Sequence, residues 1–215
     1  VIESAKEIDI PVEEWNANLL KALSQKLKSP KFGKGAIDAS EAQRLYDKVA
    51  NNPVASLCSL KRYDPKRELG LCFGRAMTAD IEAFREGISR QHTLKIWVAS
   101  ADGTHLRLPK KWRGHPDLVE EWRFHTATII PSKNGSWWVI DPTVGKPLLV
   151  SEWMANLESA VPFHELRFLL SEPSRFSANA SSNYSPQAFK PYQSYIDDLL
   201  KTFGDDVPKF VPRQR

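Results

Sequence analysis

Three residues whose types could together catalyse acyl transfer follow one another along the chain: Cys72, His125 and Asp141. Cysteine reacts as the thiolate, and a helix N-terminus and a neighbouring imidazolium both lower the thiol pKa. The imidazole in turn needs a carboxylate that fixes its tautomer and orientation. The three residues are therefore candidates for the nucleophile, the general base and the orienting carboxylate of a cysteine hydrolase.

Cys72 immediately precedes a predicted helix over residues 73–89. The apolar side chains of that helix recur on one face: Met77, Ile81, Phe84 and Ile88. The free N–H of Cys72 at the helix start is the expected first donor to the oxyanion of a tetrahedral intermediate. A second donor is expected from the preceding loop, where no residue of 53–70 is distinctive. Gly70 and Leu71 must turn the chain so that the thiol faces the other two residues.

His125 and Asp141 lie on two predicted strands of one hairpin. The segments EWRFHTATIIP and SWWVIDPTV are joined by SKNG, and Asn-Gly is a strong hairpin signal. If the chain turns at residues 133–135, positions whose numbers sum to about 268 oppose each other, and Asp141 lies within diagonal reach of His125. Pro142 lacks a ladder donor and ends the strand. The carboxylate is therefore expected at a strand end, where functional groups are commonly displayed.

Each of these residues has a structural interpretation when it is taken alone. Buried cysteine behaves as a small apolar residue, a strand histidine can serve only hydrogen bonding, and Asp-Pro can be an ordinary turn. Their combination along the chain favours chemistry. Arg75 would support a thiolate, but a cation opposes the dipole at a helix start, so we expect it to form a structural ion pair. We also expect a structural role for Cys58 rather than that of a resolving thiol.

Aromatic residues on the strands are candidates for the wall of a substrate cleft. Trp137 and Trp138 alternate across the sheet, so one is expected in the core and the other in the cleft. Trp122 lies three residues before His125 and is a similar candidate. Such rings shield a thioester from bulk water. The remaining histidines are expected at the surface or at caps: His92, His105, His115 and His164.

The bulk composition fits one globular core and argues against several classes of site. The 215 residues carry a formal charge of +4, but the basic residues are scattered, so we expect no nucleic-acid partner. Two cysteines are too few for a disulfide framework or a cysteine-based zinc site, and HExxH does not occur, so we expect no metal and no cofactor. No segment reaches the roughly eighteen apolar residues of a membrane span. The start VIESAKEID has no signal-peptide pattern and predicts an excised domain or a mature form.

Predicted helices precede predicted strands, which indicates an α+β fold. Residues 1–52 are expected to form a helical N-terminal extension, because residues 11–27 and 41–51 have helical apolar spacing. Residues 53–172 are expected to form a catalytic core. Residues 173–215 are expected to form a loop, a helix and a tail that pack on this core.

Four segments resemble the bacterial protein-glutaminase (protein-glutamine deamidase) family in sequence and order: CFGRA, LKIWVAS, WRFHTATIIP and WWVIDPTVGKPLLVSEW. That family has a Cys-aromatic-x-Arg-Ala helix start, a histidine strand and a W-V-I-D-P strand, and the resemblance spans residues 70–153. It implies a core similar to papain and transglutaminase, in which a helix bearing Cys72 packs on an antiparallel sheet that carries His125 and Asp141.

The resemblance also implies an activity and a setting. It implies a cysteine amidohydrolase that converts glutamine side chains of a protein or peptide through a thioester and releases ammonia. It further implies a bacterial protein that is secreted or delivered to a target cell as an effector or toxin. Residues 103–121 look inserted and are a candidate lid or partner surface. The N-terminal helices are a candidate surface for a protein partner.

Other functions are compatible with the same three residues. Transglutaminases pass the acyl group to an amine, and papain-like peptidases cut the main chain with the same triad. A catalytically weak effector or toxin scaffold that only binds a partner is a further alternative. The intact set of Cys72, His125 and Asp141 argues against this last alternative, because a degenerate scaffold need not keep all three.

Overall fold

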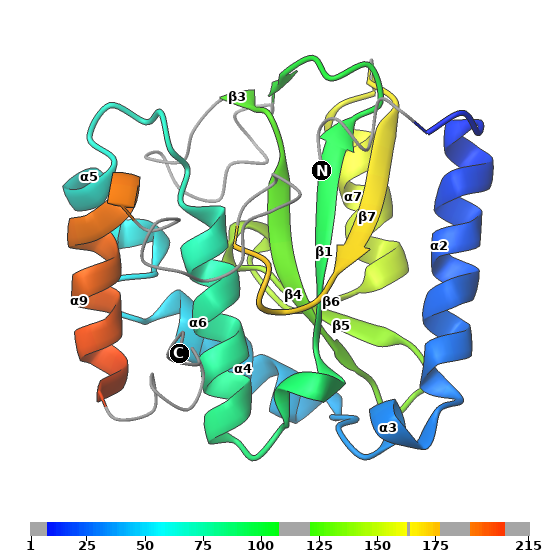
Figure 1. Ribbon diagram of the computed structural model, residues 1–215, viewed down its shortest axis with the longest axis horizontal. Helices are drawn as coiled ribbons and strands as arrows, with labels where there is room; N and C mark the ends of the chain where they lie inside the picture. Colours follow the sequence, from blue (N-terminus) through cyan, green and yellow to red (C-terminus); the bar gives the residue numbers. More distant parts are fainter. Residues whose placement is uncertain (1–7, 108–120, 163, 177–189, 205–215) are drawn as a thin grey trace.

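A five-stranded antiparallel sheet forms the centre of the computed structural model, which describes residues 8–107, 121–162, 164–176 and 190–204 (Figure 1). The strand order is β6-β5-β4-β1-β7, and β2 and β3 form a separate pair. The mixture of helices with an antiparallel sheet confirms the α+β class. The strands are β1 (Leu94–Ser100), β2 (Leu106–Arg107), β3 (Glu121–Trp122), β4 (His125–Pro131), β5 (Trp137–Ile140), β6 (Leu148–Leu149) and β7 (Leu166–Ser171).

The helices surround this sheet. In Figure 1, α4, α6 and α9 lie at the left, α2 flanks the sheet beside β7, and α7 lies behind. Contacts join α6 to β4, α4 and α9, and they join α7 to β5 and β6. None of the described helices is long and apolar enough to cross a membrane. The helices are α2 (Val12–Leu27), α3 (Pro30–Gly33), α4 (Ala39–Ala50), α5 (Leu60–Tyr63), α6 (Cys72–Arg85), α7 (Val150–Ala160) and α9 (Gln193–Phe203), with short 3-10 turns η1 (Leu57–Ser59), η2 (Arg90–His92), η3 (Pro142–Val144) and η4 (Lys190–Tyr192).

The helix that begins at Cys72 ends earlier than its periodicity predicts. Gly87 has a φ of +85°, and its N–H donates to the carbonyl of Phe84. The N–H of Ile88 donates to the carbonyl of Ala83, which completes a Schellman motif. The predicted extension to residue 89 is therefore wrong: Ile88 is buried, but it follows the helix rather than continuing it.

The β4–β5 hairpin has the predicted register. Thr128 pairs with Ile140 and Ile130 with Trp138, so opposed residue numbers sum to 268. Gly135, at the turn, has a φ of +77°, a conformation that glycine adopts without a steric penalty. The hairpin therefore brings the start of β4 close to the end of β5, where the candidate histidine and aspartate lie.

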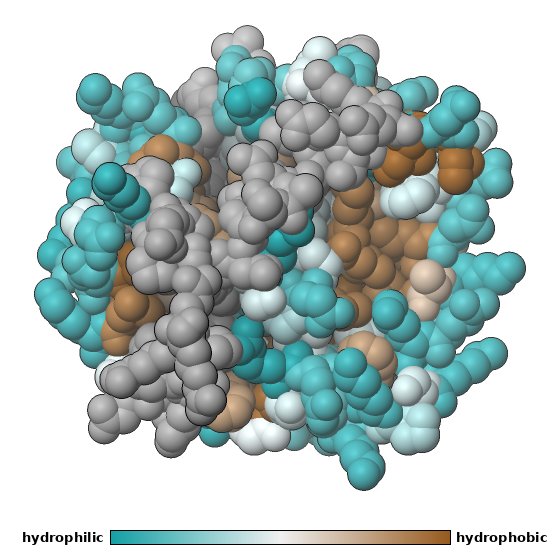
Figure 2. Space-filling model, in the orientation of Figure 1, coloured by the Kyte–Doolittle hydropathy of each residue, from teal (hydrophilic) through white to brown (hydrophobic). Residues whose placement is uncertain are grey.

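Helix α2 covers the exposed edge of β7. The indole Nε1 of Trp15 donates to the carbonyl of Phe168 at 2.7 Å, and the Asn16 amide bonds the carbonyl of Leu166 and the N–H of Phe168. An uncovered edge strand can pair with a strand of another chain. Helix α2 therefore protects the edge of β7 from such pairing. Apolar residues line a shallow hollow between α2 and β7, seen as a brown area at the right of Figure 2.

Candidate active site

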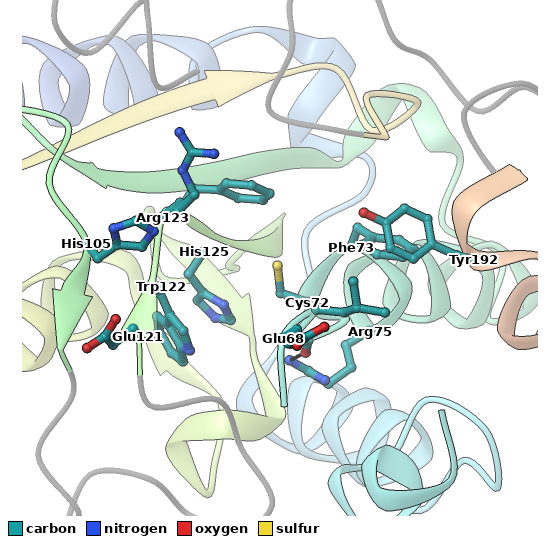
Figure 3. Close-up of a pocket in the computed structure, with 13 residues that line it drawn as sticks. Glu68, Cys72, Phe73, Arg75, His105, Glu121, Trp122, Arg123, His125 and Tyr192 are labelled. Carbon is teal, nitrogen blue, oxygen red and sulfur yellow. Dashed lines mark hydrogen bonds between the residues drawn. The ribbon is translucent and has the colours of Figure 1, made fainter. Parts of the chain in front are cut away.

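One cavity of about 230 Å³ lies where the start of α6 meets the start of β4. Figure 3 shows the Cys72 thiol and the His125 ring facing this space, with Trp122 beside the ring. The lining residues come from the loop before α6, from α6 itself, from the residue before β2, from β3 to the start of β4, and from η4: Glu68, Leu69, Gly70, Cys72, Phe73, Arg75, His105, Glu121, Trp122, Arg123, Phe124, His125 and Tyr192.

Cys72 is the first residue of α6 and is 7% exposed. Burial raises the pKa of its thiol, but other contributions outweigh that effect. A hydrogen bond to His125 and the charge of that ring lower the pKa, and the charge of Arg75 and the N–H of Thr126 lower it further. The net pKa lies below the ordinary thiol value, which favours the nucleophilic thiolate.

His125 lies between the thiol and a carboxylate. Its Nε2 is 2.8 Å from Oδ2 of Asp141, which leaves Nδ1 as the ring nitrogen for Cys72. Burial lowers the pKa of the imidazole, but the charge and hydrogen bond of Asp141, together with Cys72, raise it to about 9. The direction of this shift favours the imidazolium, which has a partner on each side.

Asp141 is held at the end of β5 by four hydrogen bonds. Besides His125, its Oδ2 accepts from Nε1 of Trp153 at 2.9 Å, and its Oδ1 accepts from the N–H and hydroxyl of Thr143. Burial raises the pKa of this carboxyl, but the charge of His125 and these donors hold it well below its usual range. Pro142 begins the 3-10 turn η3 directly after the strand, so the aspartate also caps that turn.

Trp122 stacks on the imidazole of His125. The ring centroids are 4.3 Å apart with an angle of 22° between the planes, and Trp153 lies 6.1 Å away at 31°. The two indoles fix the plane of the imidazole ring. The structure thus places Trp122 on the cavity, where the sequence suggested it. Sequence reasoning missed Trp153, because its role depends on α7 packing against the hairpin.

Trp137 and Trp138 lie away from this cavity. They pair with Pro131 and Ile130 near the hairpin turn, whereas the site is at the other end of β4 and β5. The indole of Trp137 donates to the carbonyl of Leu23 and is 1% exposed. Trp138 donates to the carbonyl of Ile37. This position corrects the expectation that one of the two lines the cleft.

Other predicted residues are placed as follows. Arg75 forms no ion pair among the described residues; instead its Nη2 donates to the carbonyl of Gly70 at 2.7 Å, which corrects the expected structural ion pair.

Cys58 is exposed and both cysteines are free thiols. His105 borders the cavity, which its sequence context did not indicate. Most of the inserted-looking segment, residues 108–120, lies outside the described residues, and so does His115.

The loop before α6 is arranged differently from a simple oxyanion site. The carboxylate of Asp64 accepts hydrogen bonds from the N–H groups of Glu68, Leu69 and Gly70. These three amides are therefore engaged and do not point to a second oxyanion donor. The first amides of α6, at Cys72 and Phe73, have no carbonyl one turn earlier within the helix and remain the donors nearest the thiol.

The described residues hold no group of three or more His, Cys, Asp or Glu side chains placed to bind a metal ion. Cys72 and His125, which both border the cavity, are instead linked to each other and through His125 to Asp141. This arrangement can form a covalent acyl intermediate on sulfur and move protons through the imidazole.

Sequence and fold are both similar to glutaminases. The family described as glutaminase matches residues 42–157. Crystal structures of pro-protein-glutaminase and of a mutant of it share the fold, with TM-scores of 0.50 and 0.52 and sequence identities of 13% and 12%. Each comparison covers 80% of this chain and 61% of that chain, so this chain spans less than two thirds of their length. No curated protein matches the sequence.

Proposed function

This chain belongs to the glutaminase family, and on that premise we propose that it hydrolyses the side-chain amide of glutamine residues in proteins or peptides. The observation that carries the proposal is the set of contacts among thiol, imidazole and carboxylate: His125 Nε2 lies 2.8 Å from Asp141, and the imidazole is hydrogen-bonded to Cys72. Delivery of the protein outside its own cell stays a prediction from the family resemblance.

The acylation step uses the ion pair of thiolate and imidazolium. The Cys72 sulfur attacks the side-chain carbonyl carbon of glutamine and forms a C–S bond. The carbonyl oxygen becomes an oxyanion, which the N–H of Cys72 is placed to stabilise at the start of α6. The imidazolium of His125 then protonates the amide nitrogen, the C–N bond breaks, and ammonia leaves a thioester behind.

Deacylation reverses the role of the imidazole. Neutral His125 takes a proton from water while the water oxygen attacks the thioester carbonyl. The C–S bond breaks, the sulfur leaves as a thiolate and the imidazolium is restored. The product is a glutamate side chain. Asp141 stays ionised throughout. The charge of His125 and the hydrogen bonds from His125, Thr143 and Trp153 hold the pKa of its carboxyl low.

The mouth of the cavity offers apolar contact surface to a protein substrate. Leu69 is 46% exposed beside the site, and partly buried Phe124 and Tyr192 line the same cavity. Exposed apolar groups around a polar centre provide contact for the main chain and neighbours of a target glutamine. Trp122, stacked on His125, forms the wall of the cavity beside the imidazole.

The test is the intact mass of a glutamine-containing protein after incubation, together with ammonia release. We expect the small mass gain of an NH2-to-OH exchange, and we expect Cys72→Ala to abolish both signals while the circular dichroism spectrum is unchanged. Cys58→Ala is the matched control and should retain full activity, because that thiol is exposed and lies in η1. Addition of an amine would indicate transglutamination, fragments would indicate proteolysis, and no shift with any substrate would indicate a binding module.

A further inference from the structure

The loop that leads into the nucleophile is built around one buried carboxylate. Asp64 is 4% exposed, and its two oxygens accept the N–H groups of Glu68, Leu69 and Gly70 at 2.8, 3.0 and 2.8 Å. An aspartate that collects three successive amides fixes the backbone direction over those residues. The residue after them is Leu71, the N-cap of the helix that carries Cys72.

The backbone here adopts conformations that it would not hold unaided. Arg67, Gly70 and Leu71 have φ values of 59°, 66° and 50°, in the left-handed region. Arg67 and Leu71 are the positive-φ residues other than glycine in the described part of the chain. Such conformations persist where surrounding contacts over-determine them, and they cluster at functional sites. In this loop, the Asp64 carboxylate provides such contacts to the backbone N–H groups before Leu71.

Arg75 provides the contact from the other side. From the first turn of α6 its side chain reaches back, and Nη2 donates to the carbonyl of Gly70 at 2.7 Å. Arg75 is 3% exposed, and its Nε and Nη1 have no hydrogen-bond partner among the described residues. A buried cation without a carboxylate partner is costly, and Arg75 lies on the wall of the cavity that Cys72 borders. Its charge acts on the Cys72 thiol.

We propose that Asp64 and Arg75 are positioning residues that clamp Gly70 from its N–H and its carbonyl, and so set the direction and the charge environment of the Cys72 thiol. Asp64 fixes the amides that precede the turn, and Arg75 fixes the carbonyl and places a positive charge near the sulfur. The proposal rests on the proposed function for its kinetic readout. Its main test, the reactivity of the thiol, does not require that function.

Arg167 offers a matched control for Arg75. It also donates Nη2 to a single backbone carbonyl, that of Ile10 at 2.8 Å, and is 7% exposed. Its Nε and Nη1 likewise have no partner among the described residues. It lies on β7 and does not border the cavity. Loss of either guanidinium removes the same kind of structural bond, but only Arg75 is near the thiol.

The first experiment measures the rate of iodoacetamide alkylation of Cys72 against pH, with Cys58→Ala as the background. We expect Arg75→Gln to slow alkylation about tenfold at neutral pH and to move its rise to higher pH, because one pKa unit changes the thiolate fraction tenfold. Arg75→Lys should retain most of the rate. Arg167→Gln should leave the profile unchanged. An unchanged profile in Arg75→Gln, or an equal shift in Arg167→Gln, would overturn the role of the guanidinium.

The second experiment replaces Asp64 with Asn, which keeps the size but removes one acceptor oxygen and the charge. We expect kcat for ammonia release to fall about 100-fold with KM nearly unchanged, because small misplacements of a nucleophile cost that much. Asp38→Asn is the control, since Asp38 binds the N–H of Glu41 at a helix cap. A loss in Asp64→Asn no larger than in Asp38→Asn would overturn the proposal. If Asp64→Asn does not fold, the alkylation profiles of Arg75→Gln and Arg167→Gln test the proposal.

The two proposals fail in different ways. If the unmodified protein releases no ammonia from any glutamine substrate, the proposed function fails, while the alkylation profiles still decide whether Arg75 acts on Cys72. If ammonia is released and the alkylation profiles of Arg75→Gln and Arg167→Gln agree with each other, the positioning role is rejected and the proposed function stands.

Discussion

The chemistry at Cys72 depends on two opposing effects of burial. Removal from water disfavours the thiolate, and it also disfavours the imidazolium of His125. Each charge is nevertheless stabilised by the other, and Asp141 adds a second negative partner for the ring. The directions of the two pKa shifts, down for sulfur and up for the imidazole, favour the ion pair across neutral pH.

The first prediction concerns the pH dependence of alkylation and of kcat/KM. The value of kcat/KM should fall as the pH rises through about 9, where His125 loses its proton. Both kcat/KM and the alkylation rate should fall in acid, once the thiol is protonated. His125→Asn removes the counter-charge, so the Cys72 pKa should rise and alkylation at neutral pH should slow at least about tenfold. His164→Asn is the control, because that ring lies outside the cavity. An unaltered alkylation rate in His125→Asn would contradict the ion pair.

The sequence located the three central residues because local signals mark each of them. Asn-Gly set the hairpin register, Pro142 marked the strand end, and the helix pattern marked Cys72. Trp153 and Asp64 carry no such signal. Trp153 reaches Asp141 only once α7 packs on the hairpin, and Asp64 binds amides within a loop that has no periodic pattern. Tertiary contacts of this kind are not encoded in local spacing.

At the scale of elements, α6 is tied to the sheet by buried polar groups as well as by apolar packing. Asp80 of α6 and Lys95 of β1 are fully buried, with Nζ and Oδ2 3.8 Å apart. Burial raises the pKa of Asp80 to about 7 and lowers that of Lys95 to about 8. The Thr128 hydroxyl, on β4, lies within hydrogen-bond distance of both the Ala76 carbonyl and Asp80. These contacts define how α6 sits on the strands that carry the site.

The second prediction separates the two members of this buried pair. Replacing Asp80 alone by Leu, or Lys95 alone by Met, should lower the free energy of unfolding by about 3–5 kcal/mol, because each change leaves an uncompensated buried charge. The double replacement should recover most of that loss. Urea unfolding of the four proteins measures the coupling. Additive losses in the double variant would show that the two side chains do not stabilise each other.

The third prediction concerns the contact between α6 and α9. A Cβ placed on Gly74 would lie 2.1 Å from the hydroxyl oxygen of Tyr195, a separation that real Cβ atoms do not show. Gly74→Ala should therefore force α9 away and lower the free energy of unfolding by at least about 1–3 kcal/mol. Gly33→Ala is the control, because a Cβ there meets no atom within 4 Å. Equal thermal stability of the two variants would contradict the close approach.

At the scale of the whole molecule, residues before the family match share the core of the sheet. Leu19 and Leu23 of α2 belong to the same buried cluster as Ile96 and Trp153. Phe32 packs edge-on against Trp137 with ring centroids 5.2 Å apart. The sequence predicted helices here from their spacing. That spacing could not show which strands they cover, because the partner of an amphipathic face lies elsewhere in the chain.

The last prediction is that the N-terminal helices are required for the folded site. Deletion of residues 1–33 removes the Trp15 and Asn16 bonds to the edge of β7 and exposes Trp137. We expect the shortened chain to lose its cooperative thermal transition and its alkylation profile together, because α2 buries part of the common core.

Single substitutions on α2 give the graded version of this test. Leu23→Ala should lower the free energy of unfolding by about 2–5 kcal/mol, because that side chain is 1% exposed, whereas Lys21→Ala on the exposed face of the same helix should change it little. A deleted chain that unfolds cooperatively at the temperature of the intact protein and keeps its reactive Cys72 would contradict the requirement. It would instead support an N-terminal unit that is separate from the catalytic core.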